Sequence, residues 1–353
     1  MARRARQVAR HAAPRIQVSI VHRPAGLRGQ ARMWRRMLRA ARPDALCAYD
    51  VNPRELFPSL LGRMRGVPVI VEVGDLAGEL LAAHGVRGPR LAYRRGAERA
   101  AWHGASVLTV RGPGFVPLLR ERGVSRPIHV VPEGVDRELF RPLDPAPGRA
   151  LLGLSEGERA VGVAGTIVWN PVTATAYGWE LVDGLPHMPG EWRAVVVGQR
   201  YGQGDGVARL RARAEELGVG DRLLTPSRIE HEQVPSVLAA LDAVTWTQTP
   251  DAAGSGRTTL KLPEYLACGK YVLASDVGEA RRLIAGNGRL LPYGGGRDLA
   301  YARAVAGAVA ALPDRAELDR LGAHGVERAR EFGWEAVADR FCEVVELALG
   351  GGK

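Results

Sequence analysis

Apolar positions along this chain follow two spacings. Short runs such as residues 67–73 and 193–198 are apolar at most positions, which is typical of strands buried on both faces of a parallel sheet. Elsewhere, apolar side chains recur every three or four residues, as in residues 26–41, which is the spacing of a helix that buries one face. Strands that alternate with helices predict right-handed βαβ units and therefore an α/β fold with parallel sheets.

The same patterns place the individual elements. The predicted strands are residues 16–21, 44–49, 67–73, 106–110, 128–131, 160–165, 193–198, 222–225, 243–249 and 271–275. The predicted helices are residues 3–12, 26–41, 54–65, 90–103, 113–122, 175–185, 207–217, 231–240, a short helix from about 262, another from 278, 298–312 and 333–349. Pro263 is expected at the first position of the short helix from 262, because its missing N–H costs nothing there.

The length of 353 residues exceeds one ordinary core and fits two domains. The Pro-rich segment 142–148 predicts a linker, so we expect a first domain at residues 1–147 and a second at 148–332. Residues 333–353 form a final segment whose apolar side chains share one helical face.

The net charge of +11 is carried almost wholly by Arg, because Lys occurs only at 261, 270 and 353. No aromatic residues interleave the basic ones as a platform for stacked bases, which argues against nucleic acid as a partner. Residues 1–43 hold twelve Arg and no acid. Such a segment is consistent with peripheral contact with an anionic membrane, and also with a solvated basic surface.

Other composition features narrow the class of protein. No apolar run approaches the roughly 20 residues that span a bilayer, and no signal-peptide pattern comes before the first element, so we expect a cytoplasmic protein. Cys47, Cys268 and Cys342 lie far apart in apolar contexts, which favours neither a disulfide framework nor a metal knuckle.

One stretch, residues 245–282, combines a strand, a glycine-containing loop, a short helix and a second strand. The start of a helix after such a loop predicts an anion site, because free backbone N–H groups converge there. Arg257, Thr258, Thr259 and Lys261 add cationic and hydroxyl donors around that point, and Glu264 can accept hydrogen bonds from a diol. Together they indicate a nucleotide diphosphate attached to a sugar.

Two motifs carry a resemblance to a known family. KLPEYLACGKYVLAS, residues 261–275, resembles the donor-binding segment of retaining glycosyltransferases of the GT-B fold, family 4. VVPEGVDRELFRP, residues 130–142, is similar to the hinge that closes the first domain in that family. We expect Gly134 to allow a tight turn there, and Glu133 stands where the family usually has Asn.

The resemblance implies a specific architecture. It is the GT-B fold, with two facing Rossmann-like domains, parallel sheets and an interdomain cleft. The first domain then serves the acceptor, the second binds the nucleotide-sugar donor, and the final helix packs back on the first domain. We expect the family's usual first strand to be missing from this sequence, either because Met1 is a late start or because the domain is reduced.

The resemblance also assigns roles to residues. The family's Arg and Lys pair follows the first strand of the second domain, but residues 165–179 contain no cation. Lys261 and Arg257 are therefore the candidates for stabilising the diphosphate. Asp75 keeps the family's acidic position, where it either contacts the sugar or acceptor or caps the next helix, while Gly74 takes the place of a His.

The donor-binding candidates are named by position in the same motifs: Glu264, Thr258, Thr259, Gly165, Thr166, Arg228 and Ile229. The first acid of the family's paired acidic pattern is replaced by Gly256, and Asp251 can substitute only if its loop bends back. No metal site and no cofactor beyond the nucleotide-sugar co-substrate are expected.

The sequence thus predicts a metal-independent glycosyltransferase that moves a sugar from a nucleotide-diphosphate sugar to an unknown acceptor with retention of anomeric configuration. Two alternatives stay open. One is a nucleotide-sugar epimerase of the same fold, and the other is a catalytically silent subunit that binds nucleotide sugar, which the glycines at 74 and 256 favour.

Overall fold

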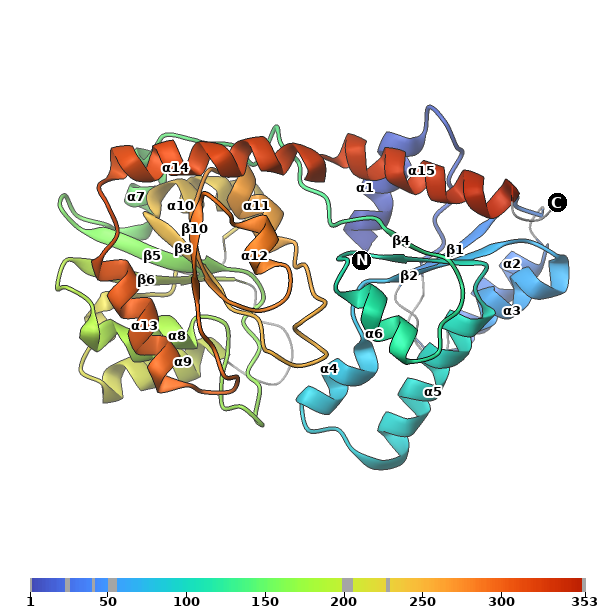
Figure 1. Ribbon diagram of the computed structural model, residues 1–353, viewed down its shortest axis with the longest axis horizontal. Coiled ribbons are helices and arrows are strands. Elements are labelled where there is room, and N and C mark those ends of the chain that lie inside the picture. The colour runs from blue at the N-terminus through green and yellow to red at the C-terminus, as the bar shows by residue number, and fades with distance from the viewer. Residues whose placement is uncertain are drawn as a thin grey trace. The chain divides into compact units, whose positions relative to one another are not determined.

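The computed structural model describes residues 2–22, 26–39, 42–49, 56–198, 206–226 and 229–350 (Figure 1). The chain forms two compact units. Unit 1 comprises Met1–Gly134, Gly256–Thr258 and Phe332–Lys353, and unit 2 comprises Val135–Ser255 and Thr259–Glu331. Each unit is built on its own parallel sheet flanked by helices, so the predicted α/β class is confirmed.

Unit 1 contains a four-stranded sheet in the order β1-β2-β3-β4, with every neighbouring pair parallel. Its strands are β1 (Leu46–Tyr49), β2 (Val69–Val73), β3 (Val107–Val110) and β4 (Ile128–Val130). Its helices are α1 (Ala2–Ala12), α2 (Leu27–Arg39), α3 (Leu56–Arg65), α4 (Ala77–Ala83), α5 (Gly88–Gly104), α6 (Phe115–Glu121) and α15 (Trp334–Gly350).

Alternate residues of β2 serve two separate cores of unit 1, as the period of a strand requires. Val71 packs in a cluster with Trp102 of α5 and Phe115 of α6. Ile70 packs in the other cluster, with residues of α1 and α15 such as Val8. The first and the last helix of the described chain therefore cover the same face of this sheet.

A buried ionic network ties α1 to the ends of the unit 1 strands. Arg4 is 3% exposed, its Nε donates to Glu72 Oε1 at 2.8 Å, and its other nitrogens donate to the carbonyls of Val131 and Pro132. Arg111 pairs with both Glu72 and Glu133, at 3.3 and 3.1 Å. Glu133, where the resembling family usually has Asn, is thus a counter-ion for two arginines.

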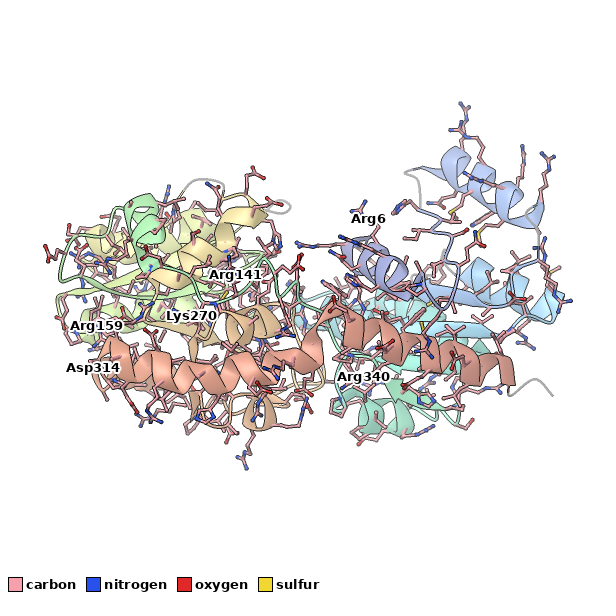
Figure 2. All side chains as sticks on the ribbon, turned by 90° about the horizontal axis from the view of Figure 1, so that it is seen from above. Arg6, Arg141, Arg159, Lys270, Asp314 and Arg340 are labelled. Atoms are coloured by element: carbon pink, nitrogen blue, oxygen red, sulfur yellow. The ribbon has the colours of Figure 1, made fainter. Side chains whose placement is uncertain are left out.

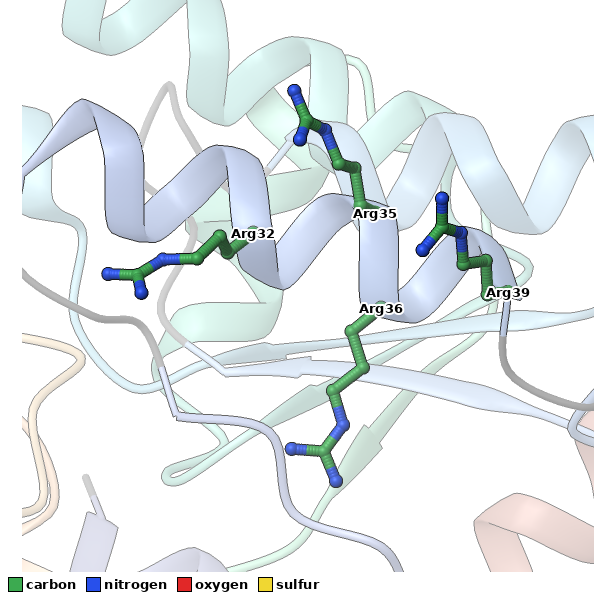
Figure 3. A pocket seen from close by; sticks show the side chains of 4 residues that line it. All are labelled: Arg32, Arg35, Arg36 and Arg39. Atoms are coloured by element: carbon green, nitrogen blue, oxygen red, sulfur yellow. The ribbon is translucent and has the colours of Figure 1, made fainter.

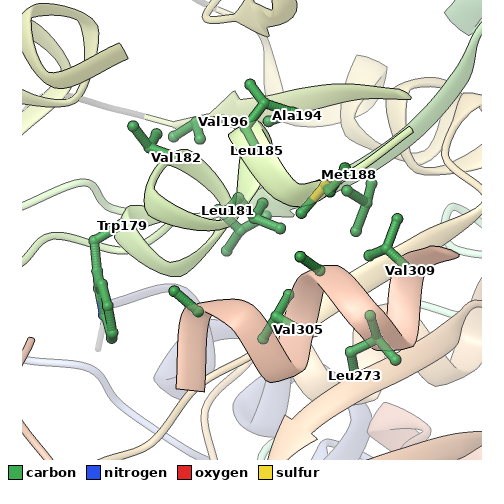
Figure 4. Close-up of a cluster of buried hydrophobic side chains, with 14 of the residues drawn as sticks. Trp179, Leu181, Val182, Leu185, Met188, Ala194, Val196, Leu273, Val305 and Val309 are labelled. Atoms are coloured by element: carbon green, nitrogen blue, oxygen red, sulfur yellow. The ribbon is translucent and has the colours of Figure 1, made fainter. Parts of the chain in front are cut away.

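Unit 2 contains a six-stranded parallel sheet in the order β10-β9-β8-β5-β6-β7. Its strands are β5 (Arg159–Ala164), β6 (Trp192–Val197), β7 (Leu223–Leu224), β8 (Ala243–Trp246), β9 (Tyr271–Ser275) and β10 (Gly288–Leu291). Its α-helices are α7 (Pro145–Leu152), α8 (Trp179–Gly184), α9 (Gly206–Glu216), α10 (Val234–Ala240), α11 (Lys261–Ala267), α12 (Ala280–Leu283), α13 (Leu299–Ala310) and α14 (Arg315–Arg328). Its largest core cluster packs α8 and α13 against the sheet, with Leu181, Val305 and Leu273 among its members (Figure 4).

Several local predictions were wrong. Residues 16–21 are not a strand, because the sheet of unit 1 begins at β1 and this segment leaves Val18 and Val21 exposed instead of pairing them. Part of the predicted linker is helix α7, since Asp144 caps it through Ala146 N and Pro145 takes its first position. The sequence interpretation also omitted α4, β10 and α14.

Two further predictions, for Pro263 and Gly134, need correction. Pro263 is the third residue of α11 and not the first, which is also within the turn whose N–H groups lack helical partners. Gly134 does not have a positive φ, so a tight turn is not what requires glycine there. A Cβ at 134 would lie 2.3 Å from the Trp334 ring, so glycine is needed for this close packing.

Candidate active site

The order of strands in unit 2 identifies one edge of its sheet. From β5, the chain first adds β6 and β7 on one side and then β8, β9 and β10 on the other. The strand order therefore reverses between β5 and β8. In open α/β sheets, ligands bind outside the carboxyl ends of the strands at such a reversal.

Lys261 lies at this reversal. Gly165 directly follows β5 and has φ +150°, and a Cβ there would be 2.2 Å from Lys261 Cε and 2.9 Å from Nζ. The Lys261 side chain therefore crosses closely over Gly165, which only glycine permits. Its Nζ lies 3.0 Å from the centroid of the Tyr177 ring. The structure thus brings together two predicted residues, Lys261 and Gly165, with one that was not predicted, Tyr177.

A buried acid interacts electrostatically with this cation. Glu180 on α8 is 1% exposed, and its Oε1 accepts hydrogen bonds from Thr245 Oγ1 at 2.8 Å and Thr247 Oγ1 at 3.0 Å. Burial raises the pKa of Glu180, while these hydrogen bonds and the charge of Lys261 oppose that rise. Lys261 is therefore close enough to interact electrostatically with a carboxyl group that has no contact with bulk water.

The start of α11 is anchored by Tyr265, which the sequence interpretation also missed. The Tyr265 hydroxyl is buried, accepts from Ala164 N at 2.9 Å and donates to Ala164 O at 3.2 Å. This pair of bonds joins α11 to the end of β5 and so fixes where Lys261 leaves the backbone. Glu264, one turn after Lys261, is half-buried.

The loop before α11 is held by its own side chains. Trp246 Nε1 donates to Thr259 Oγ1 at 2.8 Å. Asp251 Oδ1 accepts from Thr249 Oγ1, Ala253 N and Gly254 N at 2.8 to 2.9 Å. The carboxylate of Asp251 therefore stabilises the turn of its own loop, which is a common role for Asp.

Three of the predicted site residues belong to unit 1. Asp75 Oδ1 pairs with Arg257 Nε at 2.8 Å, so the structure brings these two candidates together. Asp75 does not cap α4, because the capping residue is Leu76, and Glu98 accepts from the first N–H groups of that helix. Thr258 is buried, and a Cβ at Gly256 would lie 2.5 Å from Phe115.

Three predicted donor-binding residues remain: Thr166, Ile229 and Arg228. Thr166 follows Gly165 and is exposed, and Ile229 is half-buried. Arg228 lies outside the described residues.

Within the described ranges, no group of three or more His, Cys, Asp or Glu side chains is arranged to hold a metal ion. In that same part of the chain, none of the helices combines the length and apolar character needed to cross a membrane.

Comparison with known proteins gives sequence relatives for part of the chain. Residues 180–309 match the family described as glycosyl transferases group 1. The chain is 32% identical over 228 residues to a D-inositol 3-phosphate glycosyltransferase of Xylanimonas cellulosilytica, an alignment that covers 63% of this chain and 51% of that protein. The chain thus spans about half the length of the curated relatives it matches.

Solved structures match nearly the whole fold. HepE of Anabaena, in complex with UDP and glucose, superposes with a TM-score of 0.71 at 20% identity, covering 94% of this chain and 86% of that one. Sucrose-phosphate synthase of Thermosynechococcus elongatus superposes with a TM-score of 0.69 at 23% identity, covering 92% and 78%. These likenesses confirm the predicted GT-B fold class.

Proposed function

Residues 180–309 belong to the glycosyl transferases group 1, and from this premise we propose that the protein moves a sugar from a nucleotide-diphosphate sugar to an acceptor hydroxyl. The observation that carries the proposal is the ammonium group of Lys261 at the strand reversal of unit 2, directly over Gly165. We assign anion binding to this group and not to the helix end, because α11 has only seven residues.

Sugar transfer from a nucleotide-diphosphate donor is favoured by a positive charge beside the β-phosphate. Transfer breaks the bond between the anomeric carbon and the β-phosphate oxygen and forms a bond from that carbon to the acceptor oxygen. The acceptor hydroxyl gives up its proton to the departing phosphate or to water, and the departing nucleoside diphosphate takes the electron pair as added negative charge. A fixed ammonium group beside the β-phosphate stabilises that charge more in the transition state than in the bound donor.

Retention of configuration and independence of a metal ion are part of the proposal. Lys261 supplies positive charge without a metal, and Glu264, one turn later on α11, is suitably placed in the chain to accept from the ribose diol. HepE was solved with UDP and glucose, so UDP-glucose is the first donor to test.

A thermal-shift screen of UDP-, GDP-, ADP- and dTDP-sugars tests donor binding. A ligand that binds only the folded protein at a hundred times its Kd stabilises it by about 2.7 kcal/mol. If none of these donors raises the melting temperature, the proposal is wrong. With a donor that binds, NMR of the product gives the anomeric configuration; product from donor alone indicates an epimerase, and binding without even slow donor hydrolysis indicates a silent subunit.

We also propose that unit 1 contacts anionic membrane surfaces through α2. Its arginines are all exposed: Arg28, Arg32, Arg35, Arg36 and Arg39. Four of them line an open hollow of about 520 Å³ (Figure 3). Leu38 on the same helix is 48% exposed, so a lipid surface meets apolar as well as cationic groups. Each Arg near such a surface contributes on the order of 1 kcal/mol.

The structure restricts which part of the basic first segment is available. On α1, Arg4 is buried in the network with Glu72, whereas Arg6 is exposed (Figure 2). The apolar face of α1 is also occupied, because Val8 and Ala12 are buried in clusters with residues of α15. The proposal therefore concerns α2 and not the whole of residues 1–43.

Sedimentation with phosphatidylserine vesicles tests this surface. We expect binding at low salt that fades as salt screens the charge, and that is lost when Arg32, Arg35, Arg36 and Arg39 are changed to Gln. The control changes four exposed arginines of unit 2 to Gln: Arg281, Arg289, Arg303 and Arg320. Equal loss in both variants means that net charge alone accounts for binding, and no sedimentation of the native protein refutes the contact.

A further inference from the structure

The loop between β5 and α8 has an unusual composition for a diphosphate site. Residues 165–178 contain no Lys, Arg or His. One cation nevertheless contacts both ends of this loop. The Lys261 side chain lies close to Gly165 at the start of the loop and to the Tyr177 ring near its end. That cation comes from α11, more than eighty residues further along the chain.

The contact with Tyr177 restricts where the ammonium group can lie. Nζ is 3.0 Å from the centroid of the ring, and an aromatic face attracts a cation electrostatically. The Lys261 stem also lies so close to Gly165 that a Cβ at that position would overlap Cε. The ring therefore helps to fix the position of the ammonium group.

A buried acid also interacts electrostatically with Lys261. Glu180 is buried with one oxygen bonded to two threonines, and within the described residues its Oε2 has no hydrogen-bond partner. The nearby tyrosines, Tyr293 and Tyr301, are neutral at physiological pH, because burial raises the pKa of each above its usual value. Lys261 thus interacts with a buried acid as well as with an aromatic ring.

We propose that Tyr177 is the positioning residue for Lys261, holding its ammonium group at the strand reversal of unit 2 as the cation of a diphosphate site whose own loop has none. The proposal rests on the proposed function for the identity of the anion. The ring is the part of Tyr177 that matters, and its hydroxyl is not required.

Lysine NMR tests the contact without any ligand. The chain has three lysines, at 261, 270 and 353, so protein carrying ¹³C-labelled lysine gives few signals, and Lys261→Met assigns the one of interest. We expect an upfield ring-current shift for the Lys261 methylene next to Nζ, kept in Tyr177→Phe and lost in Tyr177→Leu. The same shift in Tyr177→Leu as in the native protein overturns the proposal.

Steady-state kinetics of donor turnover test whether Tyr177 supports catalysis through Lys261. Tyr177→Leu should lower kcat about tenfold to thirtyfold, the value of a desolvated cation–π contact, with a smaller change in donor KM. Tyr177→Phe should recover most of the rate. The matched control is Tyr271→Leu, since Tyr271 is a half-buried tyrosine packed against the same core of unit 2 but at the start of β9. If Tyr271→Leu loses as much kcat as Tyr177→Leu, Tyr177 contributes only through packing and the proposal is wrong.

A relocated cation gives the strictest test. Because Nζ of Lys261 lies on the ring of Tyr177, Tyr177→Lys in a Lys261→Met background returns an ammonium group to about the same place. We expect this double variant to turn over at least about tenfold faster than Lys261→Met alone, as restoring most of a lost electrostatic contact predicts. No recovery by a folded double variant refutes the positioning role. If the native protein binds no nucleotide sugar, the proposed function fails, while the lysine spectrum still decides whether Tyr177 sets the position of Lys261.

Discussion

Replacing Gly165 by Ala is a direct test of the geometry around Lys261. The new Cβ would lie 2.2 Å from Lys261 Cε, whereas ordinary contacts begin near 3.4 Å, so the stem must move by about 1.2 Å. A displacement of about 1 Å in a catalytic group can cost on the order of a hundredfold in rate. We therefore expect kcat to fall about a hundredfold while donor KM changes much less.

Strain contributes separately to the stability of this variant. Gly165 has φ +150°, where a side chain costs about 1 to 3 kcal/mol in unfolding free energy. Gly157→Ala is the matched control, because Gly157 has φ +84° and a Cβ there would meet no atom within 4 Å. We expect urea unfolding to show a comparable loss of stability in both variants, and donor turnover to fall only in Gly165→Ala.

Two outcomes would contradict this reasoning about Gly165 and Lys261. If Gly165→Ala turns over like the native protein while Lys261→Ala is slow, Lys261 does not act from its position over Gly165. If Gly157→Ala loses as much kcat as Gly165→Ala, the loss reflects stability and not the place of the ammonium group.

Three further outcomes are expected. Lys261→Ala should lower kcat about a hundredfold to a thousandfold and Lys261→Arg should recover little, whereas Glu264→Ala should mainly raise donor KM, as steady-state kinetics will show. EDTA should leave transfer unchanged, and a loss that Mg²⁺ or Mn²⁺ restores would contradict the assigned charge balance. Burial, helped by Arg315, lowers the pKa of Lys270 to about 8. Between pH 8 and 10.5, Lys270 is therefore protonated in the unfolded chain but mostly neutral in the folded protein. The free energy of unfolding should rise by about 3 kcal/mol across that range, and urea titrations of Lys270→Met should lack that part of the rise.

Local chemistry made much of the site predictable. The strand, loop and helix around Lys261 are contiguous in sequence, so their spacing alone indicated where a cation follows a strand end. Asp144 before Pro145 was equally local, yet the surrounding prolines and glycine favoured a linker over the helix that forms. Residues 16–21 alternate like a strand, but alternation does not supply a partner strand.

Contacts between distant residues were not predictable. Tyr177 meets Lys261 across more than eighty residues, and nothing in its own neighbourhood identifies a ring that receives a cation. Arg4 belongs to a segment with twelve arginines, and its sequence context could not distinguish it from the exposed Arg6. Its partner Glu72 lies 68 residues away in a strand, so only the fold reveals the pair.

The packing of α1 and α15 on one sheet face has a consequence for synthesis of the chain. About 200 residues separate Gly134 from Phe332, and ribosomes add roughly 5 to 20 residues per second, so the wait is on the order of 10 to 40 s. During that interval, the apolar side chains of Ile70 and Val107 lack Trp334 and its neighbours. The unit whose sheet is translated first is therefore completed last, and until then its nascent form exposes apolar surface that favours aggregation.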